Sequence, residues 1–232
     1  AMAARLASSV SQYTGDIQLG LRWLDRSKKV AISCRNFHDV AALEYHTQRL
    51  FLFNSVHEYG KGISEINWVI SLTTADSTGW FTAMNSLLHL QLKSDKYSEA
   101  RKTADLLFAH KGLAKLPKQV ASRIRLRGLY ALVLTRVEKL PPRAFVAINI
   151  YPLDTIVLRI LWELQQGRDT QASSAMLSLK RYVDRMPKQR EDRALRLLAR
   201  LLPVYAQHAH NLRECRNNPA FIRNEAQLLV CR

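Results

Sequence analysis

The chain has 232 residues, 47% hydrophobic and 23% charged, so it can bury a substantial core as one large domain or two small ones. Only 8 residues are Gly and 7 are Pro, which argues against turn-rich all-β sandwiches and barrels. The net charge of +16 is uneven, since residues 1–100 hold 10 basic and 9 acidic side chains, whereas residues 101–232 hold 25 and 10. The second half could therefore meet an acidic protein segment, nucleic acid or anionic lipid.

Apolar residues recur at three- and four-residue spacings along almost the whole chain, which is the period of an α-helix. In chain order the clearest runs are Ile17, Leu21 and Leu24; Leu43, His46, Leu50 and Phe53; Leu126, Leu129, Val133 and Leu134; and Leu195, Leu198 and Leu202. Turn-forming residues separate such runs at Thr14-Gly15, Tyr59-Gly60, Thr74 to Gly79, Lys93 to Lys96, Gly112, Pro141-Pro142, Gly167 and Pro187. The sequence therefore predicts an all-α fold whose short turns make neighbouring helices antiparallel.

An internal repeat organises these helices. Four stretches begin just after a turn and place Gly or Ala at the second of positions i, i+3 and i+7: Ile17-Gly20-Leu24, Tyr59-Gly62-Ile66, Tyr97-Ala100-Ala104 and Asp169-Ala172-Met176. Their first residues lie 42, 38 and 72 residues apart. The last interval fits two units of about 36 residues, with Pro141 to Ala144 opening the intervening unit. A small second residue lets one helix backbone approach another closely.

The best-formed unit covers residues 84–108, where Met84 to Leu88, a turn at Lys93 to Lys96 and the sequence Tyr97-Ser98-Glu99-Ala100 follow one another. This unit resembles the tetratricopeptide repeat, in which two helices meet through a turn ending in Tyr-x-x-Ala. The resemblance is partial at residues 160–186 and loose at 8–27 and 56–70, and the spacings exceed the usual 34 residues. It implies a right-handed solenoid of antiparallel helix pairs whose groove binds a peptide or helix of another protein. An irregular helical bundle is the alternative.

The predicted domain organisation is a helical-repeat domain over residues 1–210 and a C-terminal tail over 211–232. A helix from Arg190 to Tyr205 would follow the last repeat. The tail would contain a short amphipathic helix from Ile222 to Val230.

No motif in the sequence indicates catalysis. Phosphate-binding glycine loops, serine-nucleophile elbows and zinc-protease motifs are all missing from the sequence. His208 and His210 lie on different faces of any helix, so we predict no metal site there with Cys215. His46 lies on the apolar stripe of its helix and is expected to be a hydrogen-bonded core residue rather than a general base. We predict a protein that is not an enzyme and that has no cofactor.

The four tryptophans Trp23, Trp68, Trp80 and Trp162 have apolar neighbours in the sequence. This predicts packing in the core or between repeats. The three cysteines, Cys34, Cys215 and Cys231, are too few for a disulfide scaffold and favour a reducing compartment, the cytoplasm or nucleus.

Two basic clusters are the candidate binding residues. In the first, Arg123 and Arg127 are four residues apart and share a helix face, while Arg125 points elsewhere. In the second, Arg193, Arg196 and Arg200 follow one face of a helix. The complete set of predicted contact residues is Arg123, Arg127, Lys180, Arg181, Arg193, Arg196 and Arg200. Arginine pairs well with carboxylates and phosphates, although a basic run can also be a solvated helix face.

The predicted function is a non-catalytic scaffold or adaptor subunit of a larger hetero-complex, which binds an acidic partner segment through its groove and its basic half. The alternative is a nucleic-acid-binding helical repeat that contacts phosphates with little sequence preference. In a third interpretation, the basic half lies against an acidic domain of a larger protein. No apolar stretch is long enough to predict a transmembrane segment.

Overall fold

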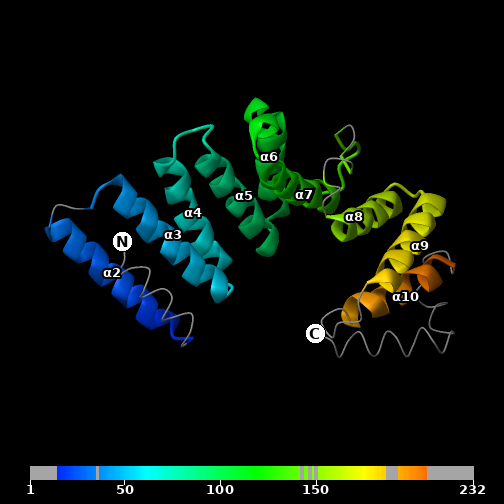
Figure 1. Cartoon of the computed structure of the whole chain (residues 1–232), viewed down its shortest axis with the longest axis horizontal. Helices are drawn as coiled ribbons and strands as arrows, with labels where there is room; N and C mark the ends of the chain where they lie inside the picture. Colours follow the sequence, from blue (N-terminus) through cyan, green and yellow to red (C-terminus); the bar gives the residue numbers. More distant parts are fainter. Residues whose placement is uncertain are drawn as a thin grey trace. The chain divides into compact units, whose positions relative to one another are not determined.

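A computed structural model describes residues 15–34, 37–141, 144, 145, 148, 151–186 and 193–207. Every regular element in this part of the chain is a helix, which confirms the all-α prediction there (Figure 1). The elements are α2 (Ile17–Ser33), α3 (Asp39–Ser55), α4 (Tyr59–Leu72), α5 (Thr78–Lys93), α6 (Tyr97–Ala109), the 3₁₀ helix η1 (Lys111–Lys115), α7 (Lys118–Leu134), α8 (Pro152–Gln165), α9 (Asp169–Arg185) and α10 (Arg193–Gln207).

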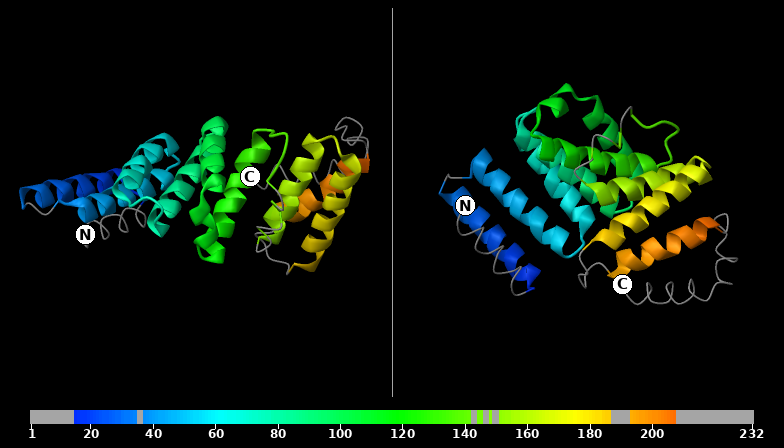
Figure 2. Two further views of the ribbon diagram at one scale, coloured as in Figure 1. Left: turned by 90° about the horizontal axis from the view of Figure 1, so that it is seen from above. Right: turned by 45° about the vertical axis from the view of Figure 1, so that its right-hand side comes forward.

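The chain divides into two compact units, Ala1–Thr135 and Arg136–Arg232. Within the first unit consecutive helices from α2 to α7 pack against one another, and within the second α8 packs on α9 and α9 on α10 (Figures 1 and 2). The single repeat domain predicted for residues 1–210 stays a prediction. The tail predicted for residues 211–232 lies outside the described residues, and so do His208, His210 and Cys215.

One type of turn occurs three times, between α3 and α4, between α5 and α6, and between α8 and α9. Its central residues are His57, Asp95 and Gly167, with left-handed φ values of 59°, 57° and 65°. In each turn the next N–H group donates a hydrogen bond back to a carbonyl five residues earlier, and the three N···O distances are all 2.9 Å. This Schellman geometry satisfies a carbonyl at the end of the first helix, and the second helix begins one residue later.

The predicted repeat pattern coincides with the helix starts. Ile17, Tyr59, Tyr97 and Asp169 are the first residues of α2, α4, α6 and α9. The small second members Gly20, Gly62, Ala100 and Ala172 are all buried. The third members Leu24, Ile66, Ala104 and Met176 are at most 2% exposed. Small residues therefore lie where a neighbouring helix comes close, as the sequence pattern predicts.

The unit predicted to open at Pro141 is not a helix where it is described. Arg136 has a left-handed φ of 52° after α7, as in the three Schellman turns. However, the described residues between Thr135 and Tyr151 form no α-helix. The adjacent Pro141 and Pro142 lack backbone N–H donors, so an α-helix could begin at this point but could not run through it.

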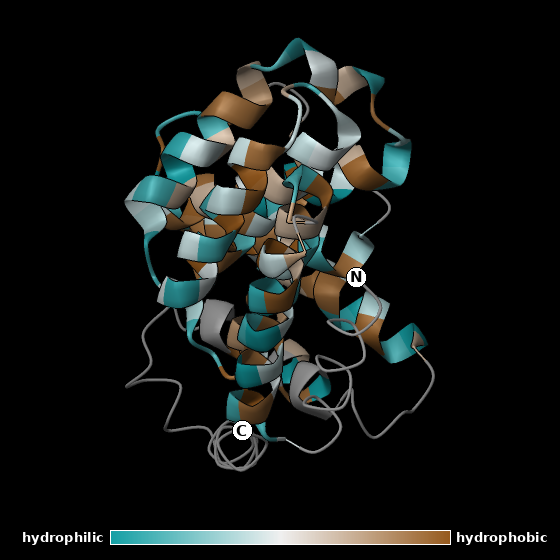
Figure 3. Ribbon diagram, turned by 90° about the vertical axis from the view of Figure 1, so that its left-hand side faces the viewer, coloured by the Kyte–Doolittle hydropathy of each residue, from teal (hydrophilic) through white to brown (hydrophobic). Residues whose placement is uncertain are grey.

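Each unit has its own apolar core. The core of the first unit contains residues of α4 to α7, including Phe81, Leu88 and Ile124, each no more than 1% exposed. A smaller cluster of Leu24, Tyr45 and Leu52 joins α2 to α3. In the second unit α8, α9 and α10 share a core that includes Met176 and Leu179. Apolar and polar residues alternate along the helical ribbons, as the amphipathic pattern requires (Figure 3).

The prediction of buried tryptophans is half right. Trp162 is 7% exposed, and Trp80 is partly buried against the core of the first unit. Trp23 and Trp68 are 48% and 58% exposed, so neither lies in the core, and packing between repeats stays a prediction for both. The buried residues of α2 are Gly20 and Leu24, and Trp23 lies beside this narrow buried stripe. The buried residues of α4 are Gly62, Glu65, Ile66 and Val69, which leaves Trp68 outside the stripe.

Candidate functional site

The predicted residues Arg123 and Arg127 belong to a basic face formed by α5 and α7. Neither helix contains an acidic residue, and the chain has none from Leu106 to Thr135. Over the same interval it carries six basic residues: Lys111, Lys115, Lys118, Arg123, Arg125 and Arg127. Because α5 and α7 pack directly on each other, two helices without any carboxylate of their own are brought together.

Arg127 joins the two helices of this face. Its Nη1 donates a hydrogen bond to the backbone carbonyl of Asn85 in α5, with an N···O distance of 3.2 Å. His89 and Lys93 lie one and two turns after Asn85, on the same side of α5. Arg123 lies one turn before Arg127 on α7 and is exposed, as expected from the sequence. The face therefore groups Arg123, Arg127, His89 and Lys93.

The pKa of His89 reports the positive potential of this face. Burial lowers it first, and the charges of Arg127 and Lys93 lower it further. All three causes disfavour the imidazolium form, so His89 is neutral at pH 7. A bound anion would oppose the two electrostatic causes.

In the second predicted cluster, one arginine is used to hold two helices together. Arg196 lies against the end of α9, where its Nη1 donates to the Val183 carbonyl and its Nη2 to the Met186 carbonyl, both at 3.1 Å. The last carbonyls of a helix lack intrahelical partners, so this guanidinium acts as a C-terminal cap. Arg200 is exposed on α10, and the Arg193 side chain lies outside the described residues.

Lys180 and Arg181 are both exposed on α9. Consecutive helical residues point about 100° apart, so these two side chains diverge. Among the described side chains of the second cluster, Lys180, Arg181 and Arg200 are exposed and Arg196 caps α9. Arg123 and Arg127, in contrast, share one face with two further basic groups.

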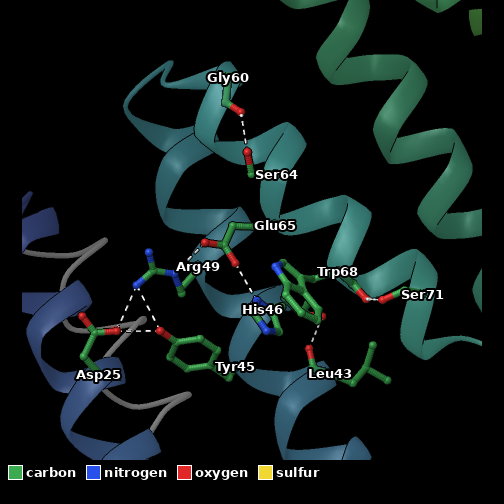
Figure 4. A network of polar contacts seen from close by, with 11 residues as sticks. Asp25, Leu43, Tyr45, His46, Arg49, Gly60, Ser64, Glu65, Trp68 and Ser71 are labelled. Carbon is green, nitrogen blue, oxygen red and sulfur yellow. Dashed lines mark hydrogen bonds and ion pairs between the residues drawn. The ribbon is translucent and has the colours of Figure 1, made fainter.

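A polar network that the sequence did not predict joins α2, α3 and α4 (Figure 4). Arg49 of α3 donates through Nε to Glu65 Oε1 of α4 at 2.7 Å and through Nη1 to Asp25 Oδ1 of α2 at 3.0 Å. Tyr45 donates its hydroxyl to the same Asp25 oxygen at 2.6 Å. His46 Nδ1 lies 2.7 Å from Glu65 Oε2, which confirms that it is a hydrogen-bonded, largely buried histidine.

The pKa of Tyr45 is raised to about 12, first by burial and then by the hydrogen bond to Asp25. The pKa of Arg49 is also raised: burial lowers it, but the hydrogen bond to Glu65 and the charge of that carboxylate outweigh burial. The exposed Trp68 ring stacks on the His46 ring, with centroids 5.3 Å apart. The contacts of this network connect α2, α3 and α4, so its evident role is to hold the three helices together.

One signal in the sequence could have located this network. Glu65 is the single acidic residue of α4, next to the buried Ile66, and a buried carboxylate needs a partner. Its partners could not be identified from the sequence, because Asp25 and Arg49 belong to two other helices.

Other site classes receive little support from the described residues. No group of three potential metal ligands occurs among them, and Cys34 is exposed as a free thiol. None of the described helices is both long enough and apolar enough to cross a membrane.

Comparison with known proteins gives no assignment: no family model, no curated protein and no solved structure matches this chain.

Proposed function

We propose that this protein is a non-catalytic scaffold or adaptor subunit that binds an acidic segment of a partner protein on the face formed by α5 and α7. The observation that carries the proposal is that α5 and α7 pack on each other and contain no carboxylate. Arg127 of α7 also donates a hydrogen bond to the Asn85 carbonyl of α5. A row of partner carboxylates would meet Arg123, Arg127 and Lys93. Such complementarity increases the association rate and specificity more than the affinity.

The proposed architecture is a right-handed, tetratricopeptide-like solenoid of antiparallel helix pairs. Three features support it: the Schellman turn that recurs after α3, α5 and α8, the buried small residue at the same position of α4, α6 and α9, and the contact of α5 with α7 across α6. In a solenoid the first helices of successive pairs line one groove, which makes α5 and α7 neighbours on its surface.

The proposed partner is a protein of the same hetero-complex, and the proposed compartment is a reducing one, cytoplasm or nucleus. Sparse cysteines support the compartment, because a chain of this size with three cysteines has no disulfide framework.

Nucleic acid is the second candidate partner. The run from Leu106 to Thr135, which has no carboxylate, would also attract phosphates. It has exposed Lys111, Lys115 and Lys118 before Arg123. Salt separates the two candidates, because each phosphate contact to a single strand changes log K by about 0.7 per unit of log salt concentration.

The test compares three fluorescein-labelled probes by anisotropy: a Glu-Gly repeat peptide, a Gln-Gly repeat peptide and a random single-stranded DNA. The protein is compared with a Lys93→Glu, Arg123→Glu double variant, in which one exposed basic residue of each helix of the face is reversed. The matched control is Lys29→Glu with Lys102→Glu, which makes the same charge change at exposed positions of α2 and α6.

The proposal expects the Glu peptide to bind more tightly than the Gln peptide. It also expects the Lys93→Glu, Arg123→Glu variant to weaken Glu-peptide binding about tenfold more than the control does, at about 0.7 kcal/mol per reversed charge. Equal losses in the two variants would show that only net charge matters. DNA binding that is tighter than peptide binding and falls steeply with salt would favour the second candidate.

A further inference from the structure

The second unit contains an open groove that none of the predicted binding residues lines. It encloses about 480 Å³ between the segment that follows Arg136 and the end of α8. The apolar part of its lining is Leu140, Pro141, Ala144, Phe145 and Trp162. This volume lies in the range of known ligand sites, about 300–1,000 Å³.

The groove lies where the repeat is interrupted. After the left-handed residues His57, Asp95 and Gly167, a helix begins two residues later. After the left-handed Arg136, the described residues up to Pro141 form no helix, and Leu140 is only partly buried. Trp162 on α8 therefore faces this irregular segment rather than a second helix of a pair.

Hydrogen-bond donors surround the apolar lining. Arg168 uses Nε for an ion pair with Glu163 Oε2 at 2.6 Å, and its two Nη groups have no partner among the described residues. Lys139 is exposed and forms no ion pair with any described residue. The indole N–H of Trp162 likewise donates to no described group. Glu138 is the single carboxylate among the lining residues, so cations and donors prevail.

We infer that this groove binds an extended peptide segment of a partner protein in which a large apolar side chain is followed by a carboxylate. The apolar side chain would lie against Trp162 and Phe145, and the carboxylate would accept hydrogen bonds from Arg168 and Lys139. A peptide fits better than a small molecule, because small-ligand sites enclose about 70–90% of the ligand surface and this groove is open to solvent. The inference is independent of the proposed function, since it uses no residue of α5 or α7.

The test is an NMR titration of the ¹⁵N-labelled full chain, followed at the Trp162 indole signal. A Trp162→Phe variant assigns that signal among the four tryptophans. The probes are three blocked tetrapeptides, Gly-Phe-Asp-Gly, Gly-Phe-Asn-Gly and Gly-Ala-Asp-Gly. The first should shift the Trp162 signal saturably, with a Kd on the order of 1 mM, and should bind at least about fivefold more tightly than each of the others.

Lys139→Glu should weaken Gly-Phe-Asp-Gly about two- to fivefold and leave Gly-Phe-Asn-Gly unchanged, because only the first carries the charge. Lys102→Glu, on α6, is the matched control and should change neither. The inference is overturned if no peptide moves the Trp162 signal, if the Ala peptide binds as well as the Phe peptide, or if Asp and Asn bind equally. The Lys93→Glu, Arg123→Glu variant should bind Gly-Phe-Asp-Gly normally, so this test and that of the α5–α7 face fail separately.

Discussion

Gly128 is the position where the packing of the first unit is most easily tested. It is buried in α7, and a Cβ atom built on it would lie 2.7 Å from Cε2 and from Cζ of the Phe108 ring in α6. Carbon atoms in contact are normally about 3.5–4.0 Å apart, so in Gly128→Ala the ring must move by about 1 Å. The small residue therefore allows α6 and α7 to approach closely.

Two effects oppose each other in Gly128→Ala. Alanine stabilises a helix interior by about 1 kcal/mol relative to glycine, whereas overpacking a core costs about 1–3 kcal/mol. Phe108 is only partly buried, which places the overpacking cost near the middle of that range. We expect the free energy of unfolding to fall by about 1 kcal/mol.

The assay is urea denaturation followed by circular dichroism at 222 nm. Gly60→Ala is the control, because Gly60 is exposed in α4 and nothing lies within 4 Å of the added Cβ. This control should raise stability by up to about 1 kcal/mol. Adding Phe108→Leu to Gly128→Ala should recover part of the loss, since the clashing ring atoms are removed. If Gly128→Ala were as stable as Gly60→Ala, the close approach of α6 and α7 would be refuted.

Three further predictions concern the polar contacts. Glu65→Gln removes the charge that accepts from Arg49 and should lower stability by about 1.5–3 kcal/mol by urea denaturation, whereas exposed Glu99→Gln on α6 should change it little. Arg196→Ala removes the cap of α9 and should cost about 1–2 kcal/mol, whereas exposed Arg200→Ala should cost less than about 0.5 kcal/mol; equal losses would contradict the cap. Because the pKa of Tyr45 is raised to about 12 from 10.0, the stability that it contributes is fully present below pH 10 and is lost as pH rises through 12. A Tyr45→Phe difference titration at 295 nm should therefore lack a phenolate transition near pH 12, and a missing transition near pH 10 instead would contradict the shift.

The sequence predicted the fold class and the helix starts because these depend on local signals. The spacing Tyr97, Ala100, Ala104 combines a turn, a small residue and an apolar residue within one helix, and the helix begins at Tyr97 as expected. The helix predicted from Arg190 to Tyr205 corresponds to α10. No helix starts near Pro141 among the described residues, and proline alone does not explain this, since α8 itself begins at Pro152.

Features that depend on contacts between helices were less predictable. The i, i+3, i+7 row of Arg193, Arg196 and Arg200 could not reveal that the Arg196 guanidinium turns back to cap α9. The apolar sequence neighbours of Trp68 predicted packing in the core or between repeats, but they could not reveal that its exposed ring stacks on His46 of α3. The groove beside Trp162 lies where the described residues from Arg136 to Pro141 form no helix. The spacing of apolar residues in the sequence does not reveal such a groove.

The most direct test of the proposed function locates the bound acidic peptide by hydrogen exchange. The full chain would be compared with and without a saturating Glu-Gly repeat peptide, with the Gln-Gly peptide as the control. Binding at the α5–α7 face predicts slower exchange in residues 78–93 and 118–134 with the Glu peptide alone. Slower exchange confined to α9 and α10, or no difference between the two peptides, would contradict the assignment of this face as the partner site.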